Sequence, residues 1–364
     1  MALTNLVKKI NEKDIIACMR DGKEHTKQEL AVLTGLSFPT VGKIVETLAE
    51  EGMLLRLGAR QESPGGRKAG VYKLNPEFAH LLLLFLQGKK VFYRICDAMG
   101  TVREEGQKSW RVCREKAQRG TERDQETERR KKIPDEPFCP DMGEFLQECV
   151  REAVAADKRI GAVSAGIPGS MYNGTVRCID GYPEMAGRNV AAELAAITGK
   201  PATAGNNMSL VALGMAERLK QGNGGPLVCL HLADTGPGMG AVVNGRAIQG
   251  FSGFQGEVGF MPLYGEDTIQ KIALDGFQQA QPGECLGKMA ACICTVLNPE
   301  RFICYLEREQ PGLAEEIVRY CGRYLPAYAM PRFVFDRNYR EDYFHGLAVT
   351  GMELLYDRRK HENA

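Results

Sequence analysis

The chain has 364 residues, which is too long for one small hydrophobic core and suggests two or three domains. Its hydrophobic content of 44%, charged content of 26% and formal net charge of +1 are ordinary for a soluble globular protein. The longest apolar run, "FAHLLLLFL", is far too short to span a bilayer, and the charged start lacks the apolar segment of a signal peptide. The 12 cysteines follow no regular spacing, so we expect reduced thiols in a cytoplasmic protein without membrane contact.

The first predicted helix lies in "KDIIACMRDG", where apolar residues recur at the spacing of one helix face. A second helix begins in "HTKQELAVLTG", in which Thr26 and Glu29 are spaced as a capping box. Leu30, Leu33 and the small Ala31 form its expected buried stripe, and Gly35 ends it.

A third helix is predicted in "LSFPTVGKIVETLAEEG", with Ser37 as its N-cap and Pro39 in its first turn. Its inward face is expected to consist of Val41, Ile44, Val45 and Leu48, and its outward face of Thr40, Lys43 and Thr47. Two helices joined by a turn of about three residues, after a supporting helix, predict a helix-turn-helix.

Two short strands, "MLLRLG" and "GVYKLN", then flank the flexible basic loop "ARQESPGGRKA", as in the winged form of this motif. Any three-helix unit exposes some Thr and Lys, and many loops are basic. The order of the helices, the turn, the wing and the mildly basic charge together favour DNA binding, so we assign residues 1–76 to a winged helix-turn-helix domain. The expected DNA contacts are Ser37, Thr40 and Lys43 near base edges, Arg60, Arg67 and Lys68 near phosphates, and Gln28.

The remaining residues, 77–364, alternate between apolar strands and amphipathic helices, which favours an α/β architecture. A charged insert at about 107–140 interrupts this pattern. It has no aromatic residue between Trp110 and Phe138, so we expect a mobile loop or a solvated helix. The alternative is that "RRKK" at 129–132 contacts DNA or a partner.

The stretch "KQELAVLTGLSFPTVGKIVETLAEEGML", followed by "PGGRKAGVYKLNP", resembles the N-terminal half of repressors in the ROK family (repressors, open reading frames and kinases). The family's order and spacing also hold for "SAGIPGSMYNGTV", "AGNNMSLVALGMAE", "TGPGMGAVVNGRAIQG", "GFQGEVGF" and "LNPERF". The resemblance covers roughly residues 10–100 and 145–352. It implies that an actin-like ATPase domain, related to ribonuclease H and built of two lobes around a cleft, follows the winged helix.

Several residues depart from what this resemblance implies for a kinase. Family kinases open the ATPase half with Asp-x-Gly-Gly-Thr, a turn that holds phosphate and magnesium. The corresponding positions here are Phe85, Leu86, Gln87, Gly88 and Lys89. The family's catalytic aspartate ends a Glu-Asn-Asp triplet, which here reads Gly205, Asn206 and Asn207. An amide cannot accept a proton at neutral pH, and losing a general base typically costs ~10²–10⁴ in rate.

The sugar and zinc positions of the family have changed as well. Phe260 stands where sugar-binding members have a histidine, and the cysteine-rich zinc loop that should follow is absent, so no metal is expected. Gly181 replaces a sugar-contacting asparagine. The glycines at 236, 238 and 240 form a loop that is inherited from nucleotide-binding relatives. We therefore expect a non-catalytic regulator without a cofactor.

An effector site remains possible in the polar cleft. Asn206, Asn207, Gly256 and Glu257 are the candidate contacts, together with the backbone of "GIPG". Asparagine offers both a donor and an acceptor, which suits a neutral hydroxylated ligand such as a sugar or its derivative. Equally, these residues can simply hydrogen-bond one another and cap strand ends.

Together these patterns predict a DNA-binding transcriptional regulator that acts as a repressor. One monomer contacts few bases, so a homodimer or homotetramer on a palindromic operator in double-stranded DNA is expected. Two alternatives stay open. One is a sugar kinase that carries a DNA-binding head, and the other is a scaffold that uses its winged helix for protein contacts.

Overall fold

A computed structural model describes most of the chain. The described residues are 2–61, 68–110, 141–179, 181–220, 224–233, 236–263, 265, 267–277, 281–306 and 310–357. None of the helices within these ranges is long and apolar enough to cross a membrane.

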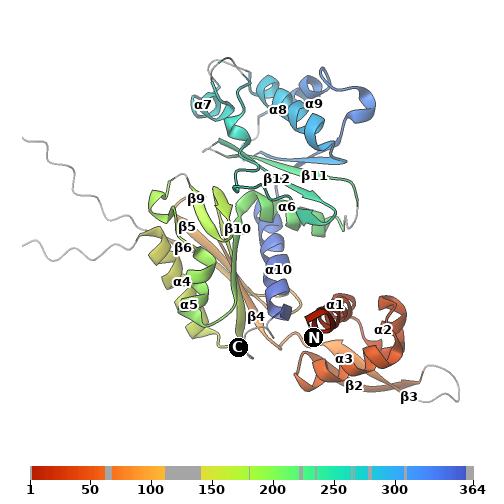
Figure 1. The fold of residues 1–364 in the computed structure, drawn as a ribbon. Coiled ribbons are helices and arrows are strands. Elements are labelled where there is room, and N and C mark those ends of the chain that lie inside the picture. The colour runs from red at the N-terminus through yellow and green to blue at the C-terminus, as the bar shows by residue number, and fades with distance from the viewer. Residues whose placement is uncertain are drawn as a thin grey trace, which may run out of the picture.

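The N-terminal elements form a small unit at the lower right of Figure 1, which we call the head. It comprises α1 (Ala2–Met19), α2 (Lys27–Thr34), α3 (Phe38–Glu50), β1 (His25–Thr26), β2 (Leu54–Gln61) and β3 (Lys68–Leu74). The strands form a sheet in the order β1-β3-β2, in which β2 and β3 are an antiparallel hairpin. The three helices and this sheet enclose one apolar core.

The capping signals of α2 and α3 are confirmed, whereas α1 begins at Ala2 and ends at Met19, well before the predicted start at Lys13 and short of Gly22. Thr26 and Glu29 form both hydrogen bonds of the capping box, and Gly35 ends α2 with a φ of 69°. The side chain of Ser37 caps α3, and all four apolar residues predicted to face inward are buried. The prediction for Leu33 is wrong, because its side chain is 58% exposed. Since α2 is only two turns long, Leu30 is its single buried residue.

The hairpin strands are longer than predicted. Because β2 continues to Gln61 and β3 begins at Lys68, Arg60 and Lys68 lie in strands rather than in a loop. Residues 62–67 between the two strands lie outside the described residues, and the predicted DNA contact Arg67 is one of them.

Two five-stranded sheets make up the rest of the fold. The first contains β4 (His80–Gln87), β5 (Lys90–Cys96), β6 (Val102–Ser109), β7 (Ile160–Ile167) and β10 (Ala202–Asn206). The second contains β11 (Leu227–Ala233), β12 (Gly236–Val243), β13 (Arg246–Ala247), β14 (Arg301–Leu306) and β15 (Arg332–Asp336). Their strand orders are β6-β5-β4-β7-β10 and β13-β12-β11-β14-β15. In each sheet the first three strands in sequence pair antiparallel, and the last two join in parallel, so one topology occurs twice.

Helices cover these sheets and connect their strands (Figure 1). They are α4 (Met142–Ala156), α5 (Val190–Thr198), α6 (Asn207–Arg218), α7 (Ile269–Leu274), α8 (Pro282–Leu297), α9 (Leu313–Cys321) and α10 (Tyr339–Asp357). Short elements complete the described fold, namely β8 (Ser170–Tyr172), β9 (Thr175–Cys178), η1 (Pro183–Met185), η2 (Val258–Phe260) and η3 (Ala327–Ala329). The predicted α/β architecture is confirmed.

The predicted charged insert begins later than expected. Residues 107–109 belong to β6 and pair with β5, so the sequence boundary at 107 is wrong by three residues. These three residues are polar and alternate between exposed and half-buried positions, as in a strand at the surface. Their polarity explains why the boundary of the charged insert was placed too early. Residues 111–140, including the basic run at 129–132, lie outside the described residues.

Helices α6 and α10 lie between the two sheets and pack at backbone contact (Figure 1). A Cβ added at Gly214 would lie 1.7 Å from the carbonyl oxygen of Asp342, and one added at Gly346 would lie 1.8 Å from that of Leu210. Only glycine permits so close an approach. One apolar core containing Phe85, Met208 and Tyr343 therefore extends from the first sheet through both helices to the second.

A buried charge network fixes α10 against the second sheet. Asp342 is 0% exposed, and its carboxylate accepts hydrogen bonds from Arg218 Nε at 2.7 Å and from the Tyr305 hydroxyl at 2.7 Å. Arg218 also donates to Asp336 at 2.6 Å. Burial raises the pKa of Tyr305, so its hydroxyl stays protonated and remains a donor.

The far end of α10 reaches the head. Tyr356 packs against the head core, as do Phe78 and Met99, and its hydroxyl donates to the carbonyl oxygen of Ala98 at 2.9 Å. The helix thus contacts the head at its C-terminal end, the first sheet through β4, β7 and β10, and the second sheet at its start through Tyr339 and Asp342.

Candidate functional sites

A cleft of about 520 Å³ contains the residues that the sequence singled out in the second half of the chain. Its walls come from both sheets, since the β4–β5 turn, the start of α6, the start of β12 and the first residue of α10 all line it. Asn206, Asn207, Gly256 and Glu257 lie together here, as does Gly181. Their role in effector binding stays a prediction.

Asn206 and Asn207 have different structural roles. Asn206 is the N-cap of α6, where its Oδ1 accepts from the backbone N–H of Ser209 at 2.9 Å. Its Nδ2 donates to the carbonyl oxygen of Gly169 at 2.7 Å and to Asn207 Oδ1 at 3.1 Å. Asn207 Nδ2 lies 3.5 Å from the Tyr339 hydroxyl. Asn206 therefore uses its amide chiefly to hold the cleft wall, and Asn207 is the one better placed to meet a ligand.

The turn between β4 and β5 faces the cleft through Gln87, Gly88 and Lys89. Phe85, which stands where kinases have an acid, is fully buried beneath this turn. Its ring stacks on that of Tyr343 at 4.2 Å and on that of Phe92 at 5.1 Å. An aromatic stack thus fills the place of a carboxylate, and it offers no oxygen ligand that would suit magnesium.

The sequence predicted a loop at Gly236, Gly238 and Gly240, and this prediction is wrong. They lie in strand β12, which pairs with β11 along its whole length. A Cβ added at Gly240 would lie 1.9 Å from the carbonyl oxygen of Met208, at the start of α6. Glycine is thus required there for strand and helix to approach each other, and Gly236 and Gly238 leave the cleft wall without side chains.

The cleft is also lined by aromatic side chains, which were not identified from the sequence. Tyr339 stacks on His231 with ring centroids 4.0 Å apart, and Trp110 meets Tyr182 edge to face at 6.3 Å. They come from separate elements, so no motif in the sequence could have grouped them. Phe260, in contrast, is absent from the cleft lining and packs on Phe254 at 5.2 Å. Amides and aromatic faces together suit a neutral hydroxylated ligand.

The head presents a second set of predicted residues. Gln28, Lys43 and Lys68 are exposed. The hydroxyls of Ser37 and Thr40 lie 2.8 Å apart in a hydrogen bond, and Ser37 Oγ also accepts from the backbone N–H of Thr40. These two hydroxyls therefore bond each other at the N-terminus of α3, and the pair keeps one further O–H donor.

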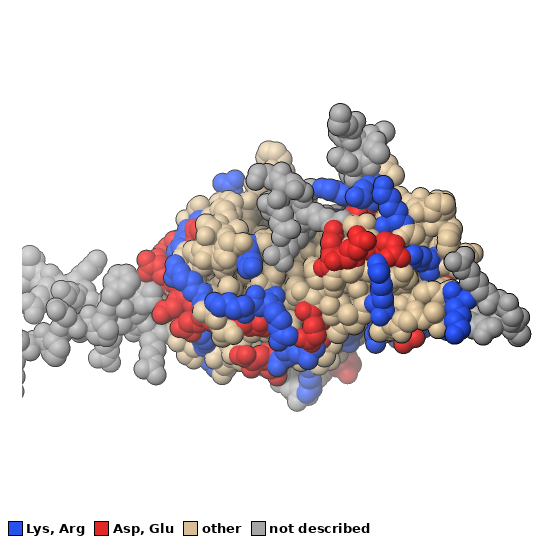
Figure 2. All heavy atoms as spheres, turned by 90° about the horizontal axis from the view of Figure 1, so that it is seen from below, with Lys and Arg blue, Asp and Glu red and all other residues tan. Residues whose placement is uncertain are grey.

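Several cations of the head are paired with acids. Arg60 forms an ion pair with Glu29, and Glu46 pairs with both Lys27 and Arg56 and accepts from the Tyr72 hydroxyl at 2.8 Å. The hydrogen bond from Lys27 is the main reason why the pKa of Glu46 lies below its ordinary value. Figure 2, which views the molecule from below, shows Lys and Arg interspersed with Asp and Glu.

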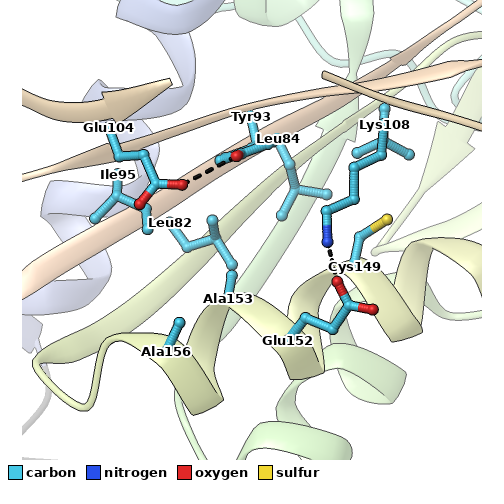
Figure 3. A pocket seen from close by; sticks show the side chains of 11 residues that line it. Leu82, Leu84, Tyr93, Ile95, Glu104, Lys108, Cys149, Glu152, Ala153 and Ala156 are labelled. Carbon is cyan, nitrogen blue, oxygen red and sulfur yellow. Dashed lines mark hydrogen bonds and ion pairs between the residues drawn. The ribbon is translucent and has the colours of Figure 1, made fainter. Parts of the chain in front are cut away.

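A smaller cavity of about 180 Å³ lies between α4 and the first sheet (Figure 3). Its floor is apolar, with Leu82 and Leu84 among the lining residues. Lys108 pairs with Glu152, and the Tyr93 hydroxyl donates to Glu104 at 3.0 Å (Figure 3). Because these polar groups bond one another, they offer less to a ligand than the amides of the larger cleft do.

Comparison with known proteins identifies a family model and curated relatives that are similar to this chain. A family model described as "ROK family" matches residues 116–308. The xylose repressor of Caldicellulosiruptor bescii is 22% identical over 270 residues, which cover 72% of this chain and 61% of that protein. The chain thus spans about 61% of the length of this curated relative.

Solved structures resemble the fold more extensively. A crystal structure of a ROK family transcriptional regulator, a homologue of the E. coli MLC protein, has a TM-score of 0.72 at 16% identity. The alignment covers 96% of this chain and 97% of that one. The ROK hexokinase from Thermus thermophilus has a TM-score of 0.57 at 19% identity and covers 76% of this chain and 99% of its own. At these identities the likeness shows the fold alone.

Proposed function

The chain belongs to the ROK family, and from this premise we propose that it is a DNA-binding transcriptional repressor without kinase activity. Residues 1–76 are its winged helix-turn-helix domain, and residues 77–364 form a degenerate sugar-kinase-like domain. The hexokinase matches 76% of the chain and the regulator 96%, and the difference is about the size of the head. The relative named a xylose repressor supports the same function.

The observation that carries this proposal is the exposed start of α3 on a three-helix head. Helix α3 buries one apolar face against the head core and leaves Lys43 in solvent. Recognition helices enter the major groove with their N-terminal residues, while a wing follows the phosphates. The β2–β3 hairpin, with Lys68 exposed near its tip, supplies such a wing.

The cleft supports a regulatory role rather than catalysis. The amide of Asn207 stands where a general base would be needed, and the buried Phe85 replaces the acid of the nucleotide turn. We therefore assign the cleft to a neutral hydroxylated effector, a sugar or a derivative of one, contacted by Asn207 and Glu257. Tyr339 lines this cleft and Tyr356 of the same helix packs on the head, so α10 connects effector and DNA.

A binding selection with genomic fragments and the full-length protein at ~150 mM salt tests the DNA-binding function. We expect enrichment of a palindromic sequence, because two heads of a symmetric dimer read inverted half-sites. Recovery without sequence preference would instead favour a scaffold that uses its winged helix for other contacts.

Effector binding is tested by titrating xylose, glucose and other neutral sugars into the protein–operator complex. One of them is expected to change operator affinity by roughly 5- to 150-fold, the usual range of allosteric coupling. Glu257→Ala should abolish this response, whereas Glu284→Ala on the remote α8 should leave it intact. A sugar response unchanged in Glu257→Ala contradicts the assigned cleft. Steady ADP release with any of these sugars, abolished by Asn207→Ala, would overturn the non-catalytic assignment.

A further inference from the structure

The first residue of α3 is an aromatic side chain that the sequence reasoning left out of the DNA surface. Phe38 follows the N-cap Ser37, and its side chain is 52% exposed. Exposed apolar residues are common on protein surfaces and need no explanation when they stand alone. The position of Phe38 is unusual because the same helix end is the part of the proposed recognition helix that faces bases.

The first turn of α3 combines two mutually bonded hydroxyls with exposed apolar side chains. Ser37 and Thr40 bond each other through their hydroxyls, and Ser37 caps the helix. Pro39, the next residue, has no N–H and an apolar ring. Beyond Ser37 and Thr40, the first exposed polar side chain of this helix is that of Lys43. This end of the helix therefore presents the apolar side chains of Phe38 and Pro39 next to the paired hydroxyls.

Duplex DNA offers one apolar group in the major groove, the C5-methyl group of thymine. The exposed cation of Lys68 on the same head is complementary to the phosphates that flank such a group. We propose that the ring of Phe38 packs on the methyl group of a thymine in each operator half-site and selects an A·T base pair there. This inference rests on the proposed DNA-binding function.

The test uses the operator recovered by selection with the full-length protein. Each thymine of a half-site is replaced in turn by deoxyuridine, which lacks only the methyl group, and affinities are measured at fixed salt. At one position we expect a loss of about fourfold per methyl group, the effect of burying one methyl-sized apolar group. Phe38→Ala should bind thymine and deoxyuridine equally at that position, and Phe38→Leu should keep part of the discrimination.

A matched control is Val32→Ala on α2, whose side chain is 75% exposed but lies outside the proposed recognition helix. This variant should retain the thymine preference of the wild type. Thermal unfolding of Phe38→Ala is expected to match the wild type, since the residue is half-exposed. Specific operator binding with equal affinity for thymine and deoxyuridine at every position overturns this inference alone. The same holds for a preference that survives in Phe38→Ala. A selection that enriches no sequence overturns the proposed function and this inference with it.

Discussion

Arg218→Ala is expected to lower the free energy of unfolding by about 3 kcal/mol, because it leaves a buried carboxylate without its cation. Asp342 is completely buried and would retain only the hydroxyl of Tyr305 as a donor. Asp336 would lose the same partner. The lost interactions hold α10 against the second sheet. We therefore expect the stability of the whole fold to fall, rather than only local fraying.

Urea unfolding at neutral pH measures this effect, and two variants make the measurement specific. Arg319→Ala removes an exposed arginine whose ion pair with Glu316 spans 3.7 Å, and such a pair contributes at most about 1 kcal/mol. Arg218→Met combined with Asp342→Asn removes both charges and should be more stable than Arg218→Ala, since no charge is left buried alone. Equal losses in Arg218→Ala and Arg319→Ala would show that the buried pair contributes nothing special.

Lys43→Ala is expected to weaken operator binding by about 10-fold or more, because a side chain that reads base edges discriminates by roughly 1–3 kcal/mol. Non-specific DNA should lose much less affinity, so the specificity ratio falls. The reason is positional, since Lys43 is the first exposed polar side chain after the apolar start of α3. Fluorescence anisotropy with operator and scrambled duplexes measures both affinities.

Two lysine variants separate base reading from simple attraction to phosphate. Lys68→Ala should weaken all sequences alike and reduce the salt slope by ~1, as expected for a phosphate contact. Lys271→Ala changes net charge equally but lies in α7, at the end of the molecule opposite the head (Figure 1), and should have no effect. If Lys43→Ala behaves like Lys68→Ala, then Lys43 contacts phosphate and does not read sequence.

Local signals in the sequence predicted the helices of the head well. The capping box at Thr26, the glycine at Gly35 and the N-cap at Ser37 depend on residues within four positions of each other, and all three are confirmed. The prediction for Leu33 was wrong because burial depends on tertiary packing and not on local signals. Its spacing fits a buried stripe, but this two-turn helix packs on the core through Leu30 and the partly buried Ala31, and Leu33 stays exposed.

Several features of the cleft could not be predicted from the sequence. The glycines of β12 were attributed to a loop because glycine-rich segments usually form one, and only the approach of Met208 explains them in a strand. Trp110, Tyr182, His231 and Tyr339 belong to no motif, and folding alone brings them to one cavity. The identity of Asn207 was visible in the sequence, but its contact with Tyr339 was not.

By itself the sequence determined the α/β class, the family resemblance and the capped ends of α2 and α3, because these depend on short-range periodicity, capping and motif order. Tertiary structure decided which polar groups are already used. Arg60 pairs with Glu29 across 31 residues and Arg218 with Asp342 across 124, and no local pattern encodes either contact. Burial and pairing are properties of segments distant in sequence. The availability of a side chain for DNA or for an effector could therefore be judged only once the chain was folded.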